Sequence, residues 1–232
     1  MEHLILLHGA IGSKQQLAPL QASLSAHYCV HTLNFYGHGG HNFVNKPFSI
    51  PLFAEQVIHY IKSISPQQVH IFGYSMGGYV ALYIAKHYPT IAQKIITLGT
   101  KFYWDKHIAF KEAQQLQPAV IEQKIPAFAK ILQERHTAQQ WVNVLNQTAD
   151  MLKAMGENNH FCETDYASIT SPVCVMLGDR DKMVTLQETI NVYTNLFNAQ
   201  MVVLPNAPHP IEQVHVGLLS YMIHYFIHHD TN

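Results

Sequence analysis

A serine with a glycine two positions away on either side is the feature of this chain with the clearest chemistry. The sequence VHIFGYSMGGYVALYIAKHYP places Gly73, Ser75 and Gly77 between an apolar run typical of a strand and a helix rich in small residues. Glycines at these positions let a strand and a helix pass close together around a sharply turned serine. The positive end of the helix and the Met76 amide would then face an oxyanion formed when Ser75 attacks a carbonyl. The pattern predicts acyl-transfer chemistry on Ser75.

A serine hydroxyl needs a base and an acid to activate it, so other elements must bring such groups to Ser75. Short apolar runs alternate with helical patterns, which predicts a parallel sheet covered by helices. Between the runs, apolar residues at helical spacing predict two helices, and the second has Ser49 as its N-cap and ends near Ser63. The four runs before residue 100 are LILL at 4–7, YCVHTLNF at 28–35, VHIFG at 69–73 and KIITLG at 94–99.

The pattern changes after residue 100. Residues 101–165 show no convincing strand, and Gln, Lys, Glu and Ala surround apolar residues at helical spacing. Pro118 and Pro126 divide this segment into several helices, and a GENN turn at 156–159 lies near its end. The segment is therefore predicted to be a helical cap.

Strand patterns resume after the cap. PVCVMLG at 172–178 and QMVVLP at 200–205 are the fifth and sixth runs, and an amphipathic helix follows from about Ile211. We therefore expect one core, formed by residues 1–100 and 166–232, that is split by the cap at 101–165.

These motifs resemble the α/β-hydrolase superfamily, particularly its small bacterial esterase-like and lyase-like members with a helical cap, and the resemblance covers almost the whole chain. In that family a strand ends in a His-Gly turn whose following residues supply a second oxyanion amide. LILLHGAIGS matches this turn, which implies that Ala10 is the second donor beside Met76. His8 is expected to be a buried residue bonded to the backbone. A family DxxGxG turn appears as NFYGHGGH, with Asn34 in place of the usual Asp.

The resemblance also implies the acid and the base, in the chain order Ser, Asp, His. The segment GDRDKMV matches a family GxxDxxV pattern that makes Asp181 the acid, with Asp179 as the competitor. The loop NAPHPIEQV follows the last predicted strand and places His209 where the family has its base. Residues 207–208 are Ala-Pro where the family more often has a glycine before the histidine, so the loop conformation is left open. The expected catalytic residues are Ser75, Asp181 and His209.

The implied fold is a reduced α/β-hydrolase with a six-stranded, mainly parallel sheet, helices on both faces and an inserted helical cap. The sequence begins at the strand that leads to His8, so the two strands that usually precede it are expected to be missing. Since the antiparallel strand of the family is one of these two, we expect all six strands to be parallel, with right-handed crossovers.

The composition argues against several classes of function. Fourteen basic and fifteen acidic side chains balance, without a run of Lys and Arg, so nucleic acid is not an expected partner. No apolar stretch is long enough to span a bilayer, and MEHLILLHGA lacks the pattern of a secretory signal, so a cytoplasmic protein is expected. Three widely spaced cysteines predict reduced thiols, and the protein is expected to be a monomer or a homodimer.

We expect neither a metal nor a cofactor. His224 and His228 have the spacing that places two imidazoles on one helix face, but no third ligand and no HExxH pattern accompanies them. The runs GHGG and SMGG fit neither a dinucleotide nor a P-loop fingerprint.

The expected function is hydrolysis of a small-molecule carboxylic ester or thioester through an acyl-enzyme on Ser75. Candidate substrate contacts are Tyr36, in the glycine-rich turn after the second strand, and Trp104 and Trp141 in the cap, where aromatic surface suits an apolar acyl or aryl group.

Two alternatives stay open. A carbon–oxygen or carbon–carbon lyase could use the same triad for proton abstraction, but substrates with several carboxylates need guanidinium groups, and the chain offers only Arg135 and Arg180. A ligand-binding member of the fold could retain the architecture without the chemistry.

Overall fold

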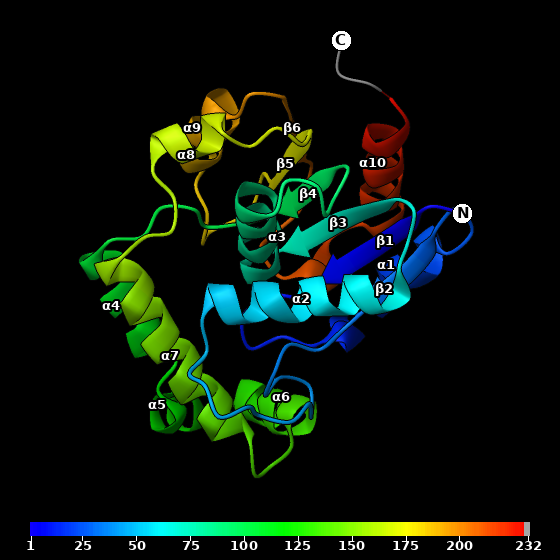
Figure 1. Ribbon diagram of the computed structural model, residues 1–232. Coiled ribbons are helices and arrows are strands. Elements are labelled where there is room, and N and C mark those ends of the chain that lie inside the picture. Colours follow the sequence, from blue (N-terminus) through cyan, green and yellow to red (C-terminus); the bar gives the residue numbers. More distant parts are fainter. Residues whose placement is uncertain (230–232) are drawn as a thin grey trace.

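A six-stranded sheet forms the centre of the computed structural model, which describes residues 1–229 (Figure 1). The strand order is β2-β1-β3-β4-β5-β6, and every neighbouring pair is parallel, which confirms the expected sheet. The chain runs outward from β1 to β2 and then returns to β3 on the other side of β1. The strands are β1 (His3–Leu7), β2 (Cys29–Thr32), β3 (Val69–Tyr74), β4 (Ile95–Leu98), β5 (Val173–Gly178) and β6 (Ala199–Leu204).

Helices cover both faces of this sheet. The core helices are α1 (Ala18–Leu24), α2 (Ile50–Ile64), α3 (Met76–His87), α8 (Glu163–Ala167), α9 (Leu186–Asn195) and α10 (Val216–His228). The cap segment holds α4 (Lys106–Gln115), α5 (Pro118–Lys124), α6 (Pro126–His136) and α7 (Trp141–Glu157). Two short 3-10 helices, η1 (Lys14–Leu17) and η2 (Ile211–Gln213), precede α1 and α10.

The central strands are largely apolar because their alternate side chains enter two different cores. In β1, Ile5 and Leu7 pack on the side of α2 and α3, which α9 also joins, whereas Leu4 and Leu6 pack on the side of α1 and α10. All four side chains are fully buried. A parallel strand covered on both faces reads as a continuous hydrophobic run, and this explains why the strand predictions succeeded.

Local signals in the sequence set the bounds of α2. The Ser49 hydroxyl oxygen accepts the Leu52 amide at 3.2 Å, as an N-cap does, and Pro51 lies in the first turn. The helix ends at Ile64, one residue beyond the expected end, where Ser65 adopts a left-handed conformation with φ of 42°.

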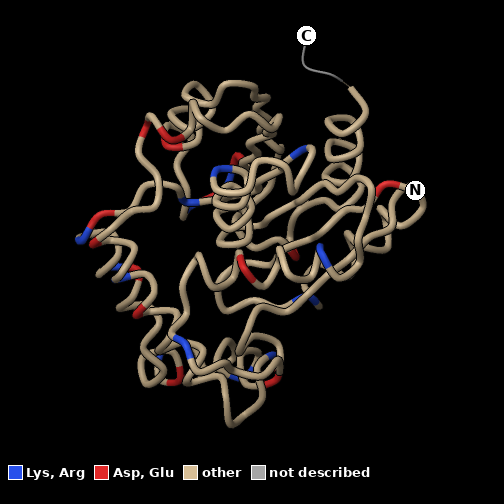
Figure 2. Tube along the Cα trace, viewed as in Figure 1, with Lys and Arg blue, Asp and Glu red and all other residues tan. Residues whose placement is uncertain are grey.

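Charged residues of both signs are interspersed over the molecule (Figure 2). Residues 106–157 contain both positive and negative side chains, and the strands contain no Lys, Arg, Asp or Glu. None of the helices within residues 1–229 combines the length and the apolar character that a membrane crossing requires.

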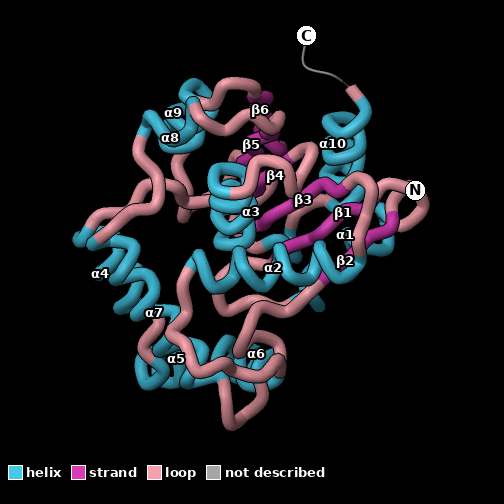
Figure 3. Tube along the Cα trace, in the orientation of Figure 1, coloured by secondary structure: helices cyan, strands magenta, loops and turns pink. Residues whose placement is uncertain are grey.

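The cap segment consists of helices and loops, and residues 101–165, all of which the structure describes, contain no strand (Figure 3). Pro118 and Pro126 are the first residues of α5 and α6, where a proline costs no helical hydrogen bond. The expected boundary at residue 165 falls inside α8. That helix packs against α9, and its Asp165 carboxylate lies 2.9 Å from Lys86 Nζ of α3, so α8 belongs with the core. We therefore place the cap at α4 to α7.

Candidate active site

Ser75 lies at the sharp turn between β3 and α3. Its φ of 53° and ψ of −118° are unfavourable for a residue with a side chain. A Cβ atom on Gly73 would overlap the backbone of Gly77 and Gly78, and one on Gly77 would lie 2.5 Å from the Leu7 carbonyl oxygen. The glycine spacing is therefore a steric requirement of this turn, as the sequence pattern predicts.

Backbone hydrogen bonds hold Ser75 in this conformation. Its amide donates to the Leu98 carbonyl at 2.8 Å, and its carbonyl accepts the Thr100 hydroxyl at 3.0 Å. Such a backbone conformation costs about 1–3 kcal/mol, which the surrounding contacts must offset. Thr100 was not among the predicted site residues, and it lies just after the fourth predicted strand.

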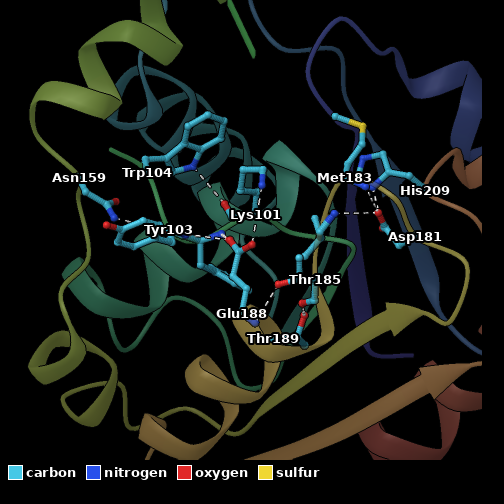
Figure 4. A network of polar contacts seen from close by, with 12 residues as sticks. Lys101, Tyr103, Trp104, Asn159, Asp181, Met183, Thr185, Glu188, Thr189 and His209 are labelled. Atoms are coloured by element: carbon cyan, nitrogen blue, oxygen red, sulfur yellow. Dashed lines mark hydrogen bonds and ion pairs between the residues drawn. The ribbon is translucent and has the colours of Figure 1, made fainter. Parts of the chain in front are cut away.

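Asp181 and His209 are hydrogen-bonded to each other (Figure 4). The Nδ1–H of His209 donates to Oδ2 of Asp181 at 2.7 Å, and the side chains are 12% and 2% exposed, respectively. The other carboxylate oxygen, Oδ1, accepts the amides of Met183 at 2.8 Å and Val184 at 2.9 Å. Since an ionised carboxylate only accepts, Nδ1 carries the proton and Nε2 is left free to take one.

The Asp181 carboxyl is held in its ionised form. Burial raises its pKa, but the hydrogen bond and charge of His209 and the amides of Val184 and Met183 outweigh burial, and the net pKa lies below its ordinary value. A carboxylate in this state fixes the imidazole tautomer and stabilises an imidazolium when one forms.

Asp179 has a different position from Asp181. Its Oδ1 accepts the Ala207 amide at 3.1 Å, and the Ala207 carbonyl accepts the Arg180 amide at 3.1 Å. These two bonds shape the loop before His209, which lacks the glycine common in the family. The structure therefore brings Asp181 to the imidazole and Asp179 to the supporting loop.

Gly99 is a site residue that the sequence analysis missed. It follows β4 with φ of 59°, and a Cβ atom there would lie 3.1 Å from Asp181 Oδ2 and 3.4 Å from His209 Nδ1. A side chain at this position would crowd the Asp181–His209 pair. The signal was present, because this glycine closes the KIITLG run at the carboxyl end of a strand.

The two expected oxyanion donors, Ala10 and Met76, line the same cavity as Ser75. Met76 is the first residue of α3, and first-turn amides have no acceptor within their own helix. Ala10 lies in a turn closed by the Gly12 amide and the Gly9 carbonyl at 3.1 Å.

His8 fixes the start of the turn that contains Ala10. Its ring is fully buried, with Nδ1–H donating to the Gly9 carbonyl at 2.8 Å and Nε2 accepting the Phe35 amide at 3.2 Å. Burial lowers its pKa to about 3, so the ring is neutral. This is the backbone-bonded residue that the sequence analysis expects.

The cap also contacts the turn that contains Ala10, because two consecutive residues of α6 donate hydrogen bonds to the carbonyl oxygen of Ile11. His136 Nε2–H donates to it at 2.8 Å, and Arg135 Nη1 donates to it at 3.1 Å. The second ring nitrogen of His136, Nδ1, accepts the Gly39 amide at 3.0 Å. One neutral imidazole thus connects the cap to two turns of the core.

Glu188 of α9 anchors the segment that leads into the cap (Figure 4). Its Oε1 accepts the amides of Phe102 at 2.7 Å and Tyr103 at 2.9 Å, and its Oε2 lies 3.8 Å from Lys101 Nζ. Backbone amides that would otherwise lack a fixed acceptor are satisfied by this carboxylate.

A cavity of about 760 Å³ joins the core to the cap. Ser75 and His209 line it from the core, and most of the remaining wall is apolar. The apolar wall residues that the cap segment contributes include Trp104, Leu116, Val120, Ile121, Phe128, Met151, Leu152 and Met155. The charged groups on the wall are Lys101, Lys111, Glu112, Lys124, Arg135 and Glu212.

Of the three expected substrate contacts, Trp104 lines this cavity, whereas Tyr36 and Trp141 are not among the residues that line it. Trp141 is 3% exposed and packs among cap residues such as Leu132. The Tyr36 ring lies against that of His41, with the ring centroids 5.4 Å apart. Both aromatics serve packing, which an apolar spacing pattern alone does not distinguish from substrate contact.

Residues 4–217 match the model of the alpha/beta hydrolase family. Over 97 residues the chain is 31% identical to pimeloyl-[acyl-carrier protein] methyl ester esterase of Xylella fastidiosa, a match that covers 42% of this chain and only 36% of that protein. A protein of the same name from Pseudoalteromonas atlantica is 25% identical over 228 residues, or 88% of this chain and 86% of that one.

Solved structures share the fold. MGS-M2, an alpha/beta hydrolase enzyme from a deep-sea metagenome library of the Medee basin, superposes with a TM-score of 0.83 at 14% identity and covers 100% of this chain and 90% of its own. The enol-lactonase of Burkholderia xenovorans has a TM-score of 0.78 at 16% identity, over 98% of this chain and 92% of that one. With the family model matched over nearly the whole sequence, the chain belongs to the alpha/beta hydrolase family.

Proposed function

We propose that this protein is a serine hydrolase that cleaves a small-molecule carboxylic ester or thioester through an acyl-enzyme on Ser75. One observation carries the proposal: the 2.7 Å bond from His209 Nδ1 to Asp181 Oδ2 lies beside a cavity that both Ser75 and His209 line. A nucleophile on a strained turn, an oriented imidazole and a buried carboxylate are the groups that acyl transfer requires.

The proposed reaction follows from these positions. Nε2 of His209 takes the Ser75 hydroxyl proton as Oγ attacks the substrate carbonyl, and the amides of Ala10 and Met76 hold the resulting oxyanion. His209 then gives the proton to the leaving alcohol or thiol, and the acyl group stays on Oγ. Water attacks the acyl-enzyme with His209 again as the base, which releases the carboxylic acid and restores Ser75.

The wall of the cavity supports an apolar acyl or aryl group in the substrate. Met151, Leu152 and Met155 of α7 lie on one helix face and line the cavity together with Trp104. The volume of about 760 Å³ falls within the range usual for small-molecule sites. Relatives named as methyl ester esterases agree with a carboxylic ester as the substrate class.

The contacts of the two arginines favour a hydrolase over the lyase alternative. The Arg135 guanidinium is occupied by the Ile11 carbonyl at 3.1 Å and by Glu212 at 3.4 Å. Arg180 is exposed, its Nε lies 3.6 Å from Asp179, and it is not among the residues that line the cavity. Neither side chain is positioned to clamp a substrate with several carboxylates.

A screen of p-nitrophenyl esters of increasing chain length, run beside acyl thioesters, tests the proposed activity. Wild type should hydrolyse at least one of these series, and Ser75→Ala should lower kcat/KM at least about 10³-fold, because no other group supplies the nucleophile. Ser63→Ala on the exposed end of α2 is the control and should match wild type. Equal rates for Ser75→Ala and wild type would reject Ser75 as the nucleophile.

A further inference from the structure

Two histidines and a cysteine meet at the amino ends of β1 and β2. His3 is the register partner of Cys29, and His31 is the partner of Ile5. Side chains two residues apart on a strand point to the same face, so His3, Cys29 and His31 all project toward the side of α2. Cys29 and His31 lie 26 and 28 positions after His3 in the chain, and the pairing of the two strands brings them to it.

The ligand atoms of this trio are close enough to share one ion. One nitrogen or sulfur from each residue lies within 4.8 Å of the others, and Nδ1 of His3 is 2.9 Å from Nε2 of His31. With Zn–N near 2.0 Å and Zn–S near 2.3 Å, a tetrahedral site needs separations of roughly 3.3–3.6 Å between ligand atoms. Small side-chain rotations would produce that geometry.

We propose that His3, Cys29 and His31 bind one zinc ion, with water as the fourth ligand. Two imidazoles and a thiolate suit zinc, which takes nitrogen and sulfur ligands in tetrahedral geometry. Carboxylate-preferring ions such as magnesium and calcium do not match this set of donors.

The hydrogen bonds around His31 fit a role as a metal ligand. Nδ1 of His31 lies 2.9 Å from the Tyr60 hydroxyl, while Nε2 faces Nδ1 of His3. Whichever tautomer His31 adopts, one proton lies between the two rings, and a zinc ion would replace it. Tyr60 would then accept the Nδ1–H of His31, as an outer partner of a zinc-bound histidine commonly does.

The structure around His3, Cys29 and His31 holds the ligands in position and leaves them accessible to a metal ion from solvent. The Cys29 amide donates to the Glu2 carbonyl at 2.9 Å, and the His3 amide donates to the Gln68 carbonyl at 3.1 Å, so the backbone holds both ligands in place. The His3 and His31 rings are stacked, with 5.1 Å between their centroids and 7° between their planes. Cys29 is exposed, which gives an ion a path from solvent.

Zinc at this position would tie the edge strand β2 to β1. The trio is remote from Ser75, because His3 pairs with Val69 at the start of β3, whereas Ser75 follows the end of that strand. Zinc should therefore stabilise the fold without changing the chemistry at Ser75, and this inference is independent of the proposed function.

Cobalt titration of the full chain tests the site, because cobalt replaces zinc and reports its ligands by absorption. Wild type should bind one cobalt per chain, with tetrahedral d–d bands and a thiolate-to-cobalt charge-transfer band, and zinc should displace it. Cys29→Ser should lose the charge-transfer band, and His31→Gln should lose the tetrahedral bands. Tyr60→Phe should weaken binding about 10- to 100-fold, as the loss of an outer partner does.

Control variants test whether cobalt binds at another thiol and whether a loss of binding results from misfolding. Cys162→Ser removes the other exposed thiol and should bind cobalt like wild type. Zinc should raise the midpoint of thermal unfolding of wild type and of Cys162→Ser but not that of Cys29→Ser or His31→Gln. Circular dichroism checks that each variant folds. Wild type that binds no cobalt, a thiolate band that survives Cys29→Ser, or binding lost only in His224→Gln would each overturn the proposal.

Discussion

The imidazole that connects the cap to the core gives a sharp prediction for stability at acidic pH. His136 uses both ring nitrogens, with Nδ1 accepting the Gly39 amide and Nε2–H donating to Ile11. Burial, opposed by the bond to Ile11 and reinforced by the charge of Arg135, lowers its pKa from 6.5 to about 4. The folded protein therefore keeps this ring neutral at a pH where the unfolded chain protonates it.

The size of the effect follows from the two pKa values. Between pH 6.5 and about 4 the unfolded chain holds one more proton at His136, so the free energy of unfolding decreases as the pH falls through this window. Within this window the free energy of unfolding decreases by about 1.4 kcal/mol for each pH unit. At pH 5 the loss from this one residue is about 2 kcal/mol, and it approaches about 3 kcal/mol near pH 4.

His136→Gln isolates this contribution, since glutamine keeps one donor and one acceptor but does not titrate. Urea unfolding, followed by tryptophan fluorescence at pH 7, 6 and 5, gives the free energy of unfolding of each protein. We expect the decrease from pH 7 to 5 to be about 2 kcal/mol smaller in the variant than in wild type. The exposed His41 supplies the control variant His41→Gln, which should follow wild type. If the free energy of unfolding fell equally with pH in His136→Gln and wild type, His136 would not be the source of this pH dependence.

Three further predictions concern the site and its support. Asp181→Asn should lower kcat for ester hydrolysis by about 10⁴-fold, as the loss of the correct imidazole tautomer does, and Asp179→Asn should lower it far less; equal losses would contradict the assignment of the acid. Glu188→Ala should reduce the free energy of unfolding by about 1–3 kcal/mol, with Glu188→Gln closer to wild type in the same urea assay, because it keeps an acceptor for the two amides. Leu152→Trp should lower kcat/KM for long-chain p-nitrophenyl esters at least about tenfold and spare the acetate; a uniform loss would mean that acyl chains do not reach α7.

Much of the fold could be predicted from the sequence because the features that determine it are short-range or follow a regular spacing. Strands β1, β3, β4 and β5 are buried on both faces and therefore need apolar residues on both, and six short apolar runs correspond to the six strands. The N-cap at Ser49 and the prolines that begin α5 and α6 act within a single helical turn. The same holds for the glycines around Ser75, whose requirement comes from the turn itself.

Features that depend on packing between distant segments could not be predicted from the sequence in the same way. The expected cap boundary at residue 165 falls inside α8, which is helical like the cap but packs on α9. Trp141 and Tyr36 were expected at the substrate, but an aromatic residue on a helix or turn does not reveal which neighbours will cover it.

The proposed zinc site departs from the expectation of no metal for the same reason. His224 and His228 have helical spacing, and the known metal motifs are short patterns along the chain. His3, Cys29 and His31 become neighbours only through the register of β1 with β2. A motif search does not test residues that a parallel pairing of strands brings together.

Covalent labelling is the direct test of whether Ser75 is an activated nucleophile. The folded protein is incubated with a fluorophosphonate, digested, and analysed by mass spectrometry for the modified peptide. We expect one adduct per chain on Ser75, absent from Ser75→Ala and formed far more slowly in His209→Ala, because the imidazole removes the hydroxyl proton. A folded wild-type protein that stays unlabelled, or that carries the adduct on a different residue, would contradict this role of Ser75.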